Sequence, residues 1–135
     1  MFSLTFTAQV ADIDELGHVN NAVWVRWMET LAVAHWRALA SAEEQAALIW
    51  VVSRHEIDYR GNLRLGETVT GETWVPDGPR GARFDRHARF VGEHGRVKVA
   101  AVTTWALLDR GTGRLSRVRP ELAKRFLSTP NEQGQ

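Results

Sequence analysis

The sequence predicts an α+β fold in which a five-stranded antiparallel sheet wraps around one long central helix. Residues 22–40 space their apolar side chains as a helix does. One segment before this helix and four after it alternate apolar and polar residues with a period of two, as strands do. A helix with one apolar face must bury that face, and a curved sheet is a simple way to do it. The buried face is predicted to hold Trp24, Trp27, Met28, Leu31 and His35.

The remaining elements follow from alternation and from turn residues. Residues 41–49 are ambiguous, since they could extend the long helix or form a short second one. A proline-led helix is expected from Pro120 to Leu127. We therefore expect a single domain over residues 1–127 and a flexible tail over 128–135. The predicted strands are residues 2–8, 49–60, 65–76, 82–92 and 96–109.

Composition excludes several classes of protein. The 17 Lys and Arg residues nearly balance the 16 Asp and Glu residues, so the charge of +1 gives no field for nucleic acid or an anionic membrane. The absence of cysteine excludes disulfides and thiolate chemistry and suits a reducing cytoplasm. No apolar run approaches the ~18 residues of a membrane span, and the first ten residues do not resemble a signal peptide. We expect a cytoplasmic protein.

Common catalytic signatures are also absent. The sequence has no G-x-S-x-G elbow, no P-loop and no H-E-x-x-H motif. Its histidines lack metal-ligand spacing, and His35 is expected to pack on its helix. Most of the basic residues over 80–98 are expected to face solvent, and the alternative is an edge that binds phosphates. These residues are Arg80, Arg83, Arg86, Arg89, Arg96 and Lys98.

The polar stretch before the long helix is the main candidate for chemistry. Asp12 and Asp14 lie where the first strand gives way to a turn, and Asn20 or Asn21 can cap the helix that follows. An acid beside the free N–H groups of a helix start can attack or activate water while the helix stabilises an oxyanion. A thiolate, with a pKa of roughly 8.5, can leave without a general acid, so thioester hydrolysis fits this minimal set. Turn formation and helix capping alone are the structural alternative.

A resemblance to a known family favours the chemical interpretation. The stretch "DIDELGHVNNAVWVRWMET" resembles the D-x-D-x-x-G-H-V-N-N-x-x-Y-x-x-x-x-E signature of the 4-hydroxybenzoyl-CoA thioesterase-like branch of the hot-dog acyl-CoA thioesterases. Two weaker matches, "HEIDYRGNLRLGETV" and "LLDRGTGRLSRVRPEL", extend the resemblance over about residues 3 to 127. It implies the hot-dog fold, a sheet wrapped around a helix. It also implies homodimers or homotetramers with active sites at the subunit interface.

The resemblance implies a role for each matching residue. Asp14 would be the nucleophile or the general base, and Asp12 a structural partner. The backbone N–H of Asn21 would polarise the thioester carbonyl. Tyr59 and Arg60 would approach the substrate across the dimer. The loop around the thioester would be shaped by Gly17, His18 and Asn20.

Two positions depart from the family pattern. Trp24 replaces the usual tyrosine and Asn62 replaces a common proline. Trp24 is expected among the substrate-binding residues, because a bulky side chain at the border of the acyl pocket would alter the preferred chain length. Both departures concern the identity of the acyl group and not the reaction. Glu29 lies on the helix, but the loop that accompanies a mid-helix acid in the other large thioesterase branch is absent.

We therefore expect an acyl-CoA thioesterase that needs no metal or redox cofactor, with some of the arginines on the CoA phosphates. The alternatives are an acyl-carrier-protein thioesterase, a hot-dog hydratase or dehydratase, and a non-catalytic acyl-CoA-binding protein. A purely structural dimer module fits the polar stretch least well.

Overall fold

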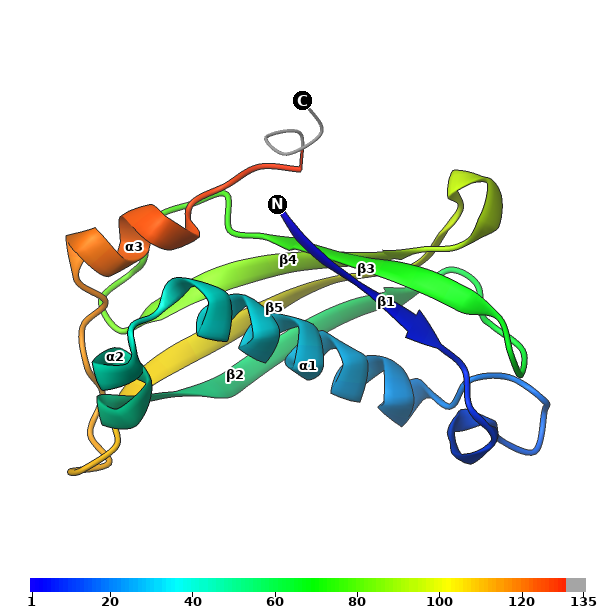
Figure 1. Ribbon diagram of the computed structural model, residues 1–135, viewed down its shortest axis with the longest axis horizontal. Coiled ribbons are helices and arrows are strands. Elements are labelled where there is room, and N and C mark those ends of the chain that lie inside the picture. Colours follow the sequence, from blue (N-terminus) through cyan, green and yellow to red (C-terminus); the bar gives the residue numbers. More distant parts are fainter. Residues whose placement is uncertain (131–135) are drawn as a thin grey trace.

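The computed structural model describes residues 1–130, in which a five-stranded antiparallel sheet curves around helix α1 (Figure 1). This confirms the predicted fold class. The strand order across the sheet is β1-β3-β4-β5-β2. The expected tail over 128–135 lies mostly outside the described residues. The strands are β1 (Phe2–Thr7), β2 (Leu48–Tyr59), β3 (Thr68–Trp74), β4 (Arg83–Val91) and β5 (Val97–Asp109), and the helices are α1 (Asn21–Leu39), α2 (Ala42–Ala47) and α3 (Pro120–Phe126).

Helix α1 forms where the apolar spacing predicts it. Asn20 is the N-cap, and its side-chain oxygen accepts a hydrogen bond of 2.9 Å from the Ala22 N–H. The polar face, with Arg26, Glu29 and Arg37, is exposed. Within residues 1–130, no helix combines the length and the apolar character that a membrane crossing requires. The buried face holds Val23, Trp24, Trp27, Met28, Leu31, Ala32, His35 and Trp36.

A glycine on β3 allows α1 to approach the sheet closely. A Cβ on Gly71 would lie 2.9 Å from the Phe90 ring, 3.0 Å from the Phe6 ring and 3.2 Å from the Leu31 side chain. Real Cβ atoms essentially never approach as closely as the first of these. The missing side chain therefore leaves room for the aromatic rings that join the sheet to the helix.

The core has two parts along α1. Around the first half of the helix, Trp24, Trp27 and Phe90 pack with residues of β1 and β3. Around the second half, Trp36 packs with Trp105 and with α3. Helix α3 thus closes one end of the curved sheet, where the Ser128 N–H donates to the Val75 carbonyl at 2.9 Å.

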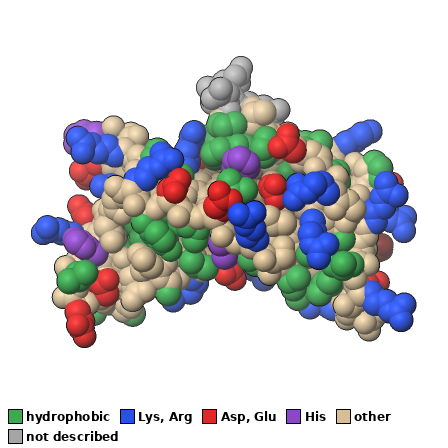
Figure 2. Space-filling view, turned by 180° about the vertical axis from the view of Figure 1, so that it is seen from behind, with side chains coloured by type: hydrophobic (Ala, Val, Ile, Leu, Met, Phe, Trp, Pro, Cys, Tyr) green, Lys and Arg blue, Asp and Glu red, His purple; other side chains and the backbone are tan. Residues whose placement is uncertain are grey.

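Over the residues that the structure describes, strand β2 forms an unpaired edge of the sheet. It pairs with β5 on one side, and a bulge near Ser53 interrupts its register. Ile49 and Val51 remain 37% exposed. The face of the sheet turned away from α1 carries side chains of both charge signs (Figure 2). The exposed apolar edge is therefore the more suitable surface for pairing with another strand.

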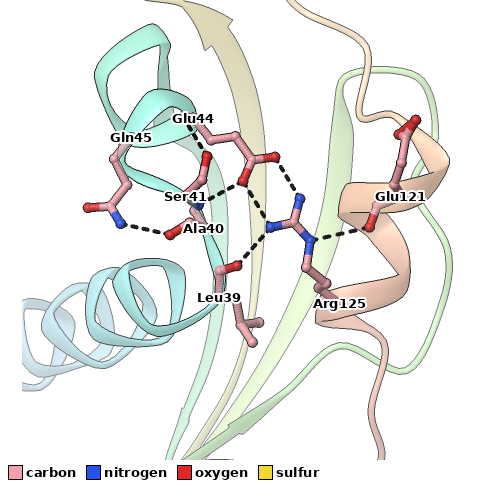
Figure 3. A network of polar contacts seen from close by, with 7 residues as sticks. All are labelled: Leu39, Ala40, Ser41, Glu44, Gln45, Glu121 and Arg125. Carbon is pink, nitrogen blue, oxygen red and sulfur yellow. Dashed lines mark hydrogen bonds and ion pairs between the residues drawn. The ribbon is translucent and has the colours of Figure 1, made fainter.

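An ion pair ties α3 to α2, and a hydrogen bond ties α3 to the end of α1 (Figure 3). Arg125 donates to both carboxylate oxygens of Glu44, at 2.9 and 2.6 Å, and to the Leu39 carbonyl at 2.8 Å. Glu44 also accepts from the Ser41 N–H at 2.8 Å, which completes the N-terminal capping box of α2. These hydrogen bonds, that from Arg125 first, lower the pKa of Glu44 to about 2.

Replacement of Glu44 by glutamine should lower Tm at pH 7 by removing the carboxylate that Arg125 holds. Because the folded-state pKa is depressed, the carboxylate stabilises the fold above its ordinary pKa of 4.5, and this stability is lost as the pH falls toward 2. The Tm difference between wild type and Glu44→Gln should therefore shrink over that interval in thermal melts. Glu43→Gln, at an exposed neighbour, is the control. A constant difference across the interval would contradict the ion pair's role.

Candidate functional site

The polar stretch folds into a small hairpin that leads into α1. The Asp14 N–H donates to the His18 carbonyl at 2.9 Å, and the Asn20 N–H donates to the Asp12 carbonyl at 2.9 Å. Gly17 makes the turn with φ of +79°, in the left-handed region that favours glycine. The hairpin holds the predicted catalytic acid and the start of the helix in one local unit.

Asp14 uses one carboxylate oxygen to stabilise this turn. Its Oδ1 accepts from the Leu16 N–H at 2.9 Å and from the His18 N–H at 3.3 Å. Within residues 1–130, its Oδ2 accepts no hydrogen bond. The side chain is half-buried. Asp14 is therefore a positioned carboxylate with one oxygen still free to react.

Asp12 has a different environment. It is buried, and its two oxygens accept from the Gln9 N–H and from Arg26 Nη2, both at 2.9 Å. Both of its oxygens are thus occupied, one by the backbone of the turn that follows β1 and the other by a side chain of α1. This arrangement agrees with the structural role expected for Asp12.

The start of α1 offers a hydrogen-bond donor. Asn21 is the first helical residue and is exposed. No acceptor among residues 1–130 takes its backbone N–H, and the helix dipole adds partial positive charge at this end. A ligand oxygen that gains negative charge would be stabilised here.

Two of the remaining candidates lie at the end of β2. The Tyr59 hydroxyl donates to the Asn21 carbonyl at 3.4 Å, and burial raises the pKa of Tyr59. The exposed Arg60 side chain pairs with Asp58 at 3.7 Å. The structure thus brings together Tyr59 and the helix start, 38 residues apart in the sequence.

Trp24 is not at the surface of this site. Its side chain is 0% exposed and packs edge-on against Trp27 and Phe90 in the core.

Within the described chain, no group of His, Cys, Asp or Glu residues could hold a metal ion.

A buried basic pair, His35 and Arg86, lies beneath the other half of α1 and is not among the site residues predicted from the sequence. Arg86 is 4% exposed, so the expectation that it faces solvent or binds phosphate at an edge is wrong. Its Nη1 donates to His35 Nδ1 at 2.9 Å and to Thr73 Oγ1 at 3.1 Å. The signal was present, because Arg86 shares the period-two face of Phe84 and Ala88.

Burial sets the charge state of this pair. Burial first, and then the Arg86 charge, lower the pKa of His35 to about 3. Burial also lowers the pKa of Arg86, to about 9. At neutral pH the histidine is therefore neutral and accepts from a charged arginine.

Comparisons with known proteins agree with the fold. The sequence model of the thioesterase-like superfamily matches residues 8–126. The chloroplast acyl-(acyl-carrier-protein) hydrolase FATB3 of Cuphea viscosissima is 25% identical over 80 residues, which are 59% of this chain and 19% of that protein. The chain therefore spans about a fifth of the length of that relative.

Two solved structures illustrate the likeness in fold. A thioesterase from Thermus thermophilus, in complex with coenzyme A and zinc, has a TM-score of 0.80 and 22% identity, over 93% of this chain and 90% of that one. The 1,4-dihydroxy-2-naphthoyl-CoA thioesterase Slr0204 from Synechocystis has a TM-score of 0.78 and 12% identity, over 93% and 94%.

His35 should make the protein less stable in mild acid. Its pKa is depressed on folding, so stability is complete above the ordinary value of 6.5 and falls as the pH drops toward 3. The loss approaches about 1.4 kcal/mol per pH unit for one proton. The variant His35→Gln has an amide oxygen that can still accept from Arg86 but takes up no proton. In urea unfolding between pH 6.5 and 4, the free energy of unfolding of wild type should therefore fall relative to that of the variant by about this slope. Parallel pH profiles for the two proteins would refute the assignment.

Proposed function

The chain belongs to the thioesterase-like superfamily, and from that membership we propose that it hydrolyses the thioester of an acyl-CoA to the free acid and CoA. The observation that carries the proposal is the positioned carboxylate of Asp14 in the hairpin that opens α1. The coenzyme A bound to the Thermus thioesterase and the CoA ester named for the Synechocystis enzyme support CoA as the carrier.

In the proposed reaction, Asp14 acts on the thioester carbonyl carbon through its free oxygen. As a nucleophile it would form a mixed anhydride as the C–S bond breaks, and water would then hydrolyse the anhydride. As a general base it would take a proton from the attacking water. Both routes yield the same acid and thiol, and both remain open.

The start of α1 would stabilise the charge that develops on the carbonyl oxygen. The Asn21 N–H is the proposed donor, with Gly17, His18 and Asn20 shaping the loop around the thioester. The leaving CoA thiolate is stable enough to depart without a general acid. The reaction therefore needs no metal or redox cofactor.

We also propose that the active protein is a homodimer or a homotetramer of such dimers. Strand β2 is an unpaired edge with exposed apolar residues, and Tyr59 lies at its end beside the helix start. A second copy paired along β2 would cover this edge and bring Tyr59 and Arg60 of each copy toward a shared interface.

A carrier-protein thioester is the second candidate substrate. The match to a chloroplast acyl-carrier-protein hydrolase favours it, although the match covers 80 residues. Comparison of kcat/KM for one acyl group on CoA and on acyl carrier protein would separate the two carriers.

Asp14→Asn should lower kcat/KM for acyl-CoA hydrolysis by about 10² to 10⁴, because the amide is neither a base nor a nucleophile of comparable strength. Thiol release can be followed with a thiol-reactive dye, because the protein contains no cysteine that would react with the dye. Asp12→Asn is the matched control and should retain most of kcat while lowering Tm. Wild-type rates in a folded Asp14→Asn protein would make Asp14 a turn residue only.

Val51→Lys should weaken self-association, because a charge on an edge strand opposes strand pairing. Sedimentation velocity should show a larger monomer fraction than for wild type, with a parallel loss of activity. Thr5→Lys places the same charge on β1, at the opposite edge, and should leave the association unchanged. Equal effects of the two substitutions would argue against pairing through β2.

A further inference from the structure

A cavity of about 310 Å³ lies at the second half of α1, between the helix and the edge strand β2. Its size is at the lower end of small-molecule sites, which span about 300 to 1,000 Å³. Its apolar walls combine aliphatic side chains with four aromatic rings, from Trp36, Trp50, Phe84 and Trp105. Such walls suit a flat apolar group.

The buried cation Arg86 also lines this cavity. It forms no ion pair within residues 1–130 and is instead flanked by the Phe84 and Phe126 rings, 5.6 and 5.7 Å from its guanidinium carbon. Its Nε has no acceptor, and its Nη2 makes no hydrogen bond with the described residues. An unpaired buried cation is costly, so an anion that entered the cavity would be strongly favoured.

The other polar groups of the cavity wall also favour an anion. The indole N–H groups of Trp50 and Trp105 are buried, and neither has an acceptor among residues 1–130. Arg37 and Arg110 also line the cavity, and no Asp or Glu does. The wall thus offers several donors and positive charge, with no competing carboxylate.

We propose that this cavity receives the acyl group of the substrate and selects acyl groups with a ring-sized apolar body and a second carboxylate at the end remote from the thioester. The ring would lie among the aromatic walls and the remote carboxylate would pair with Arg86. The inference rests on the proposed function, and it adds the substrate class.

Self-pairing of β2 connects this cavity to the reacting groups. Within one chain, Ala32 at the cavity is about 16 Å along α1 from Asn21, at 1.5 Å per residue. Tyr59 marks the end of β2 that lies beside the helix start. Antiparallel pairing about a twofold axis sets that end of one copy against the Leu48 end of the other. The cavity of one copy would therefore lie near the helix start of its partner.

The test compares kcat/KM for 4-carboxybenzoyl-CoA and benzoyl-CoA, which differ only in the remote carboxylate. Wild type should prefer the carboxylated ester about 10- to 100-fold, the range expected for a charge-assisted hydrogen bond. Arg86→Met should lose the preference, because the cation that would pair with the remote carboxylate has been removed. Arg119→Met, at an exposed arginine outside the cavity, should keep the preference.

Trp50→Phe is a second variant, for use if Arg86→Met does not fold. It keeps an aromatic ring and removes one hydrogen-bond donor, so it should reduce the preference for the carboxylated ester. Equal rates for the two esters in wild type, or an unchanged preference in Arg86→Met, would overturn the inference while leaving thioester hydrolysis intact. Failure to cleave any acyl-CoA would overturn the proposed function. In that case, calorimetric titration with terephthalate tests whether the cavity binds an aromatic carboxylate through Arg86. The absence of binding by wild type, or equal binding by Arg86→Met, would overturn the proposed selectivity.

Discussion

The burial of one face of α1 against the concave side of the sheet is the constraint on which the rest of the structure depends. Large rings on the helix meet rings on the strands, and Gly71 leaves the room they need. With the helix axis fixed in this way, its two ends acquire different surroundings. The first turn emerges beside the Asp14 hairpin and Tyr59, and the last turns cover Arg86 and the aromatic cavity. The proposed chemistry and the proposed selectivity therefore occupy opposite ends of one packing interface.

Most of the fold could be predicted because it is encoded by local periodicity. The helical spacing of α1, the alternation of the strands and the proline at the start of α3 all act within a few residues. The hairpin was predictable for the same reason, since glycine and asparagine at given positions have few conformational options. Between the two candidate caps, Asn20 takes the role because its backbone is extended (ψ 141°) and the helix begins at the next residue.

Features that depend on tertiary contacts could not be predicted in this way. The hydrogen bond from Tyr59 to Asn21 joins an edge strand to a helix start, and no periodicity reports it. The bulge near Ser53 changes which residues of β2 face the helix, so simple alternation misassigns half of that strand. Arg86 shows a different limit. Its position on the inward face was readable, but the preference of arginine for solvent outweighed the pattern.

Arg86 also shows why the two ends of the interface can be separated in function. The proposed reaction depends on a carboxylate oxygen and a backbone N–H, groups that almost any substitution in the cavity would leave in place. The choice of acyl group would depend on side chains beneath the far half of α1, which on the proposed pairing belong to the other copy. A change at Arg86 or Trp50 would then alter which acyl group is bound without altering how its thioester is attacked. Dimerisation through β2 is what would join these two independent parts into one site, so the edge strand is as necessary to the proposed enzyme as the carboxylate of Asp14.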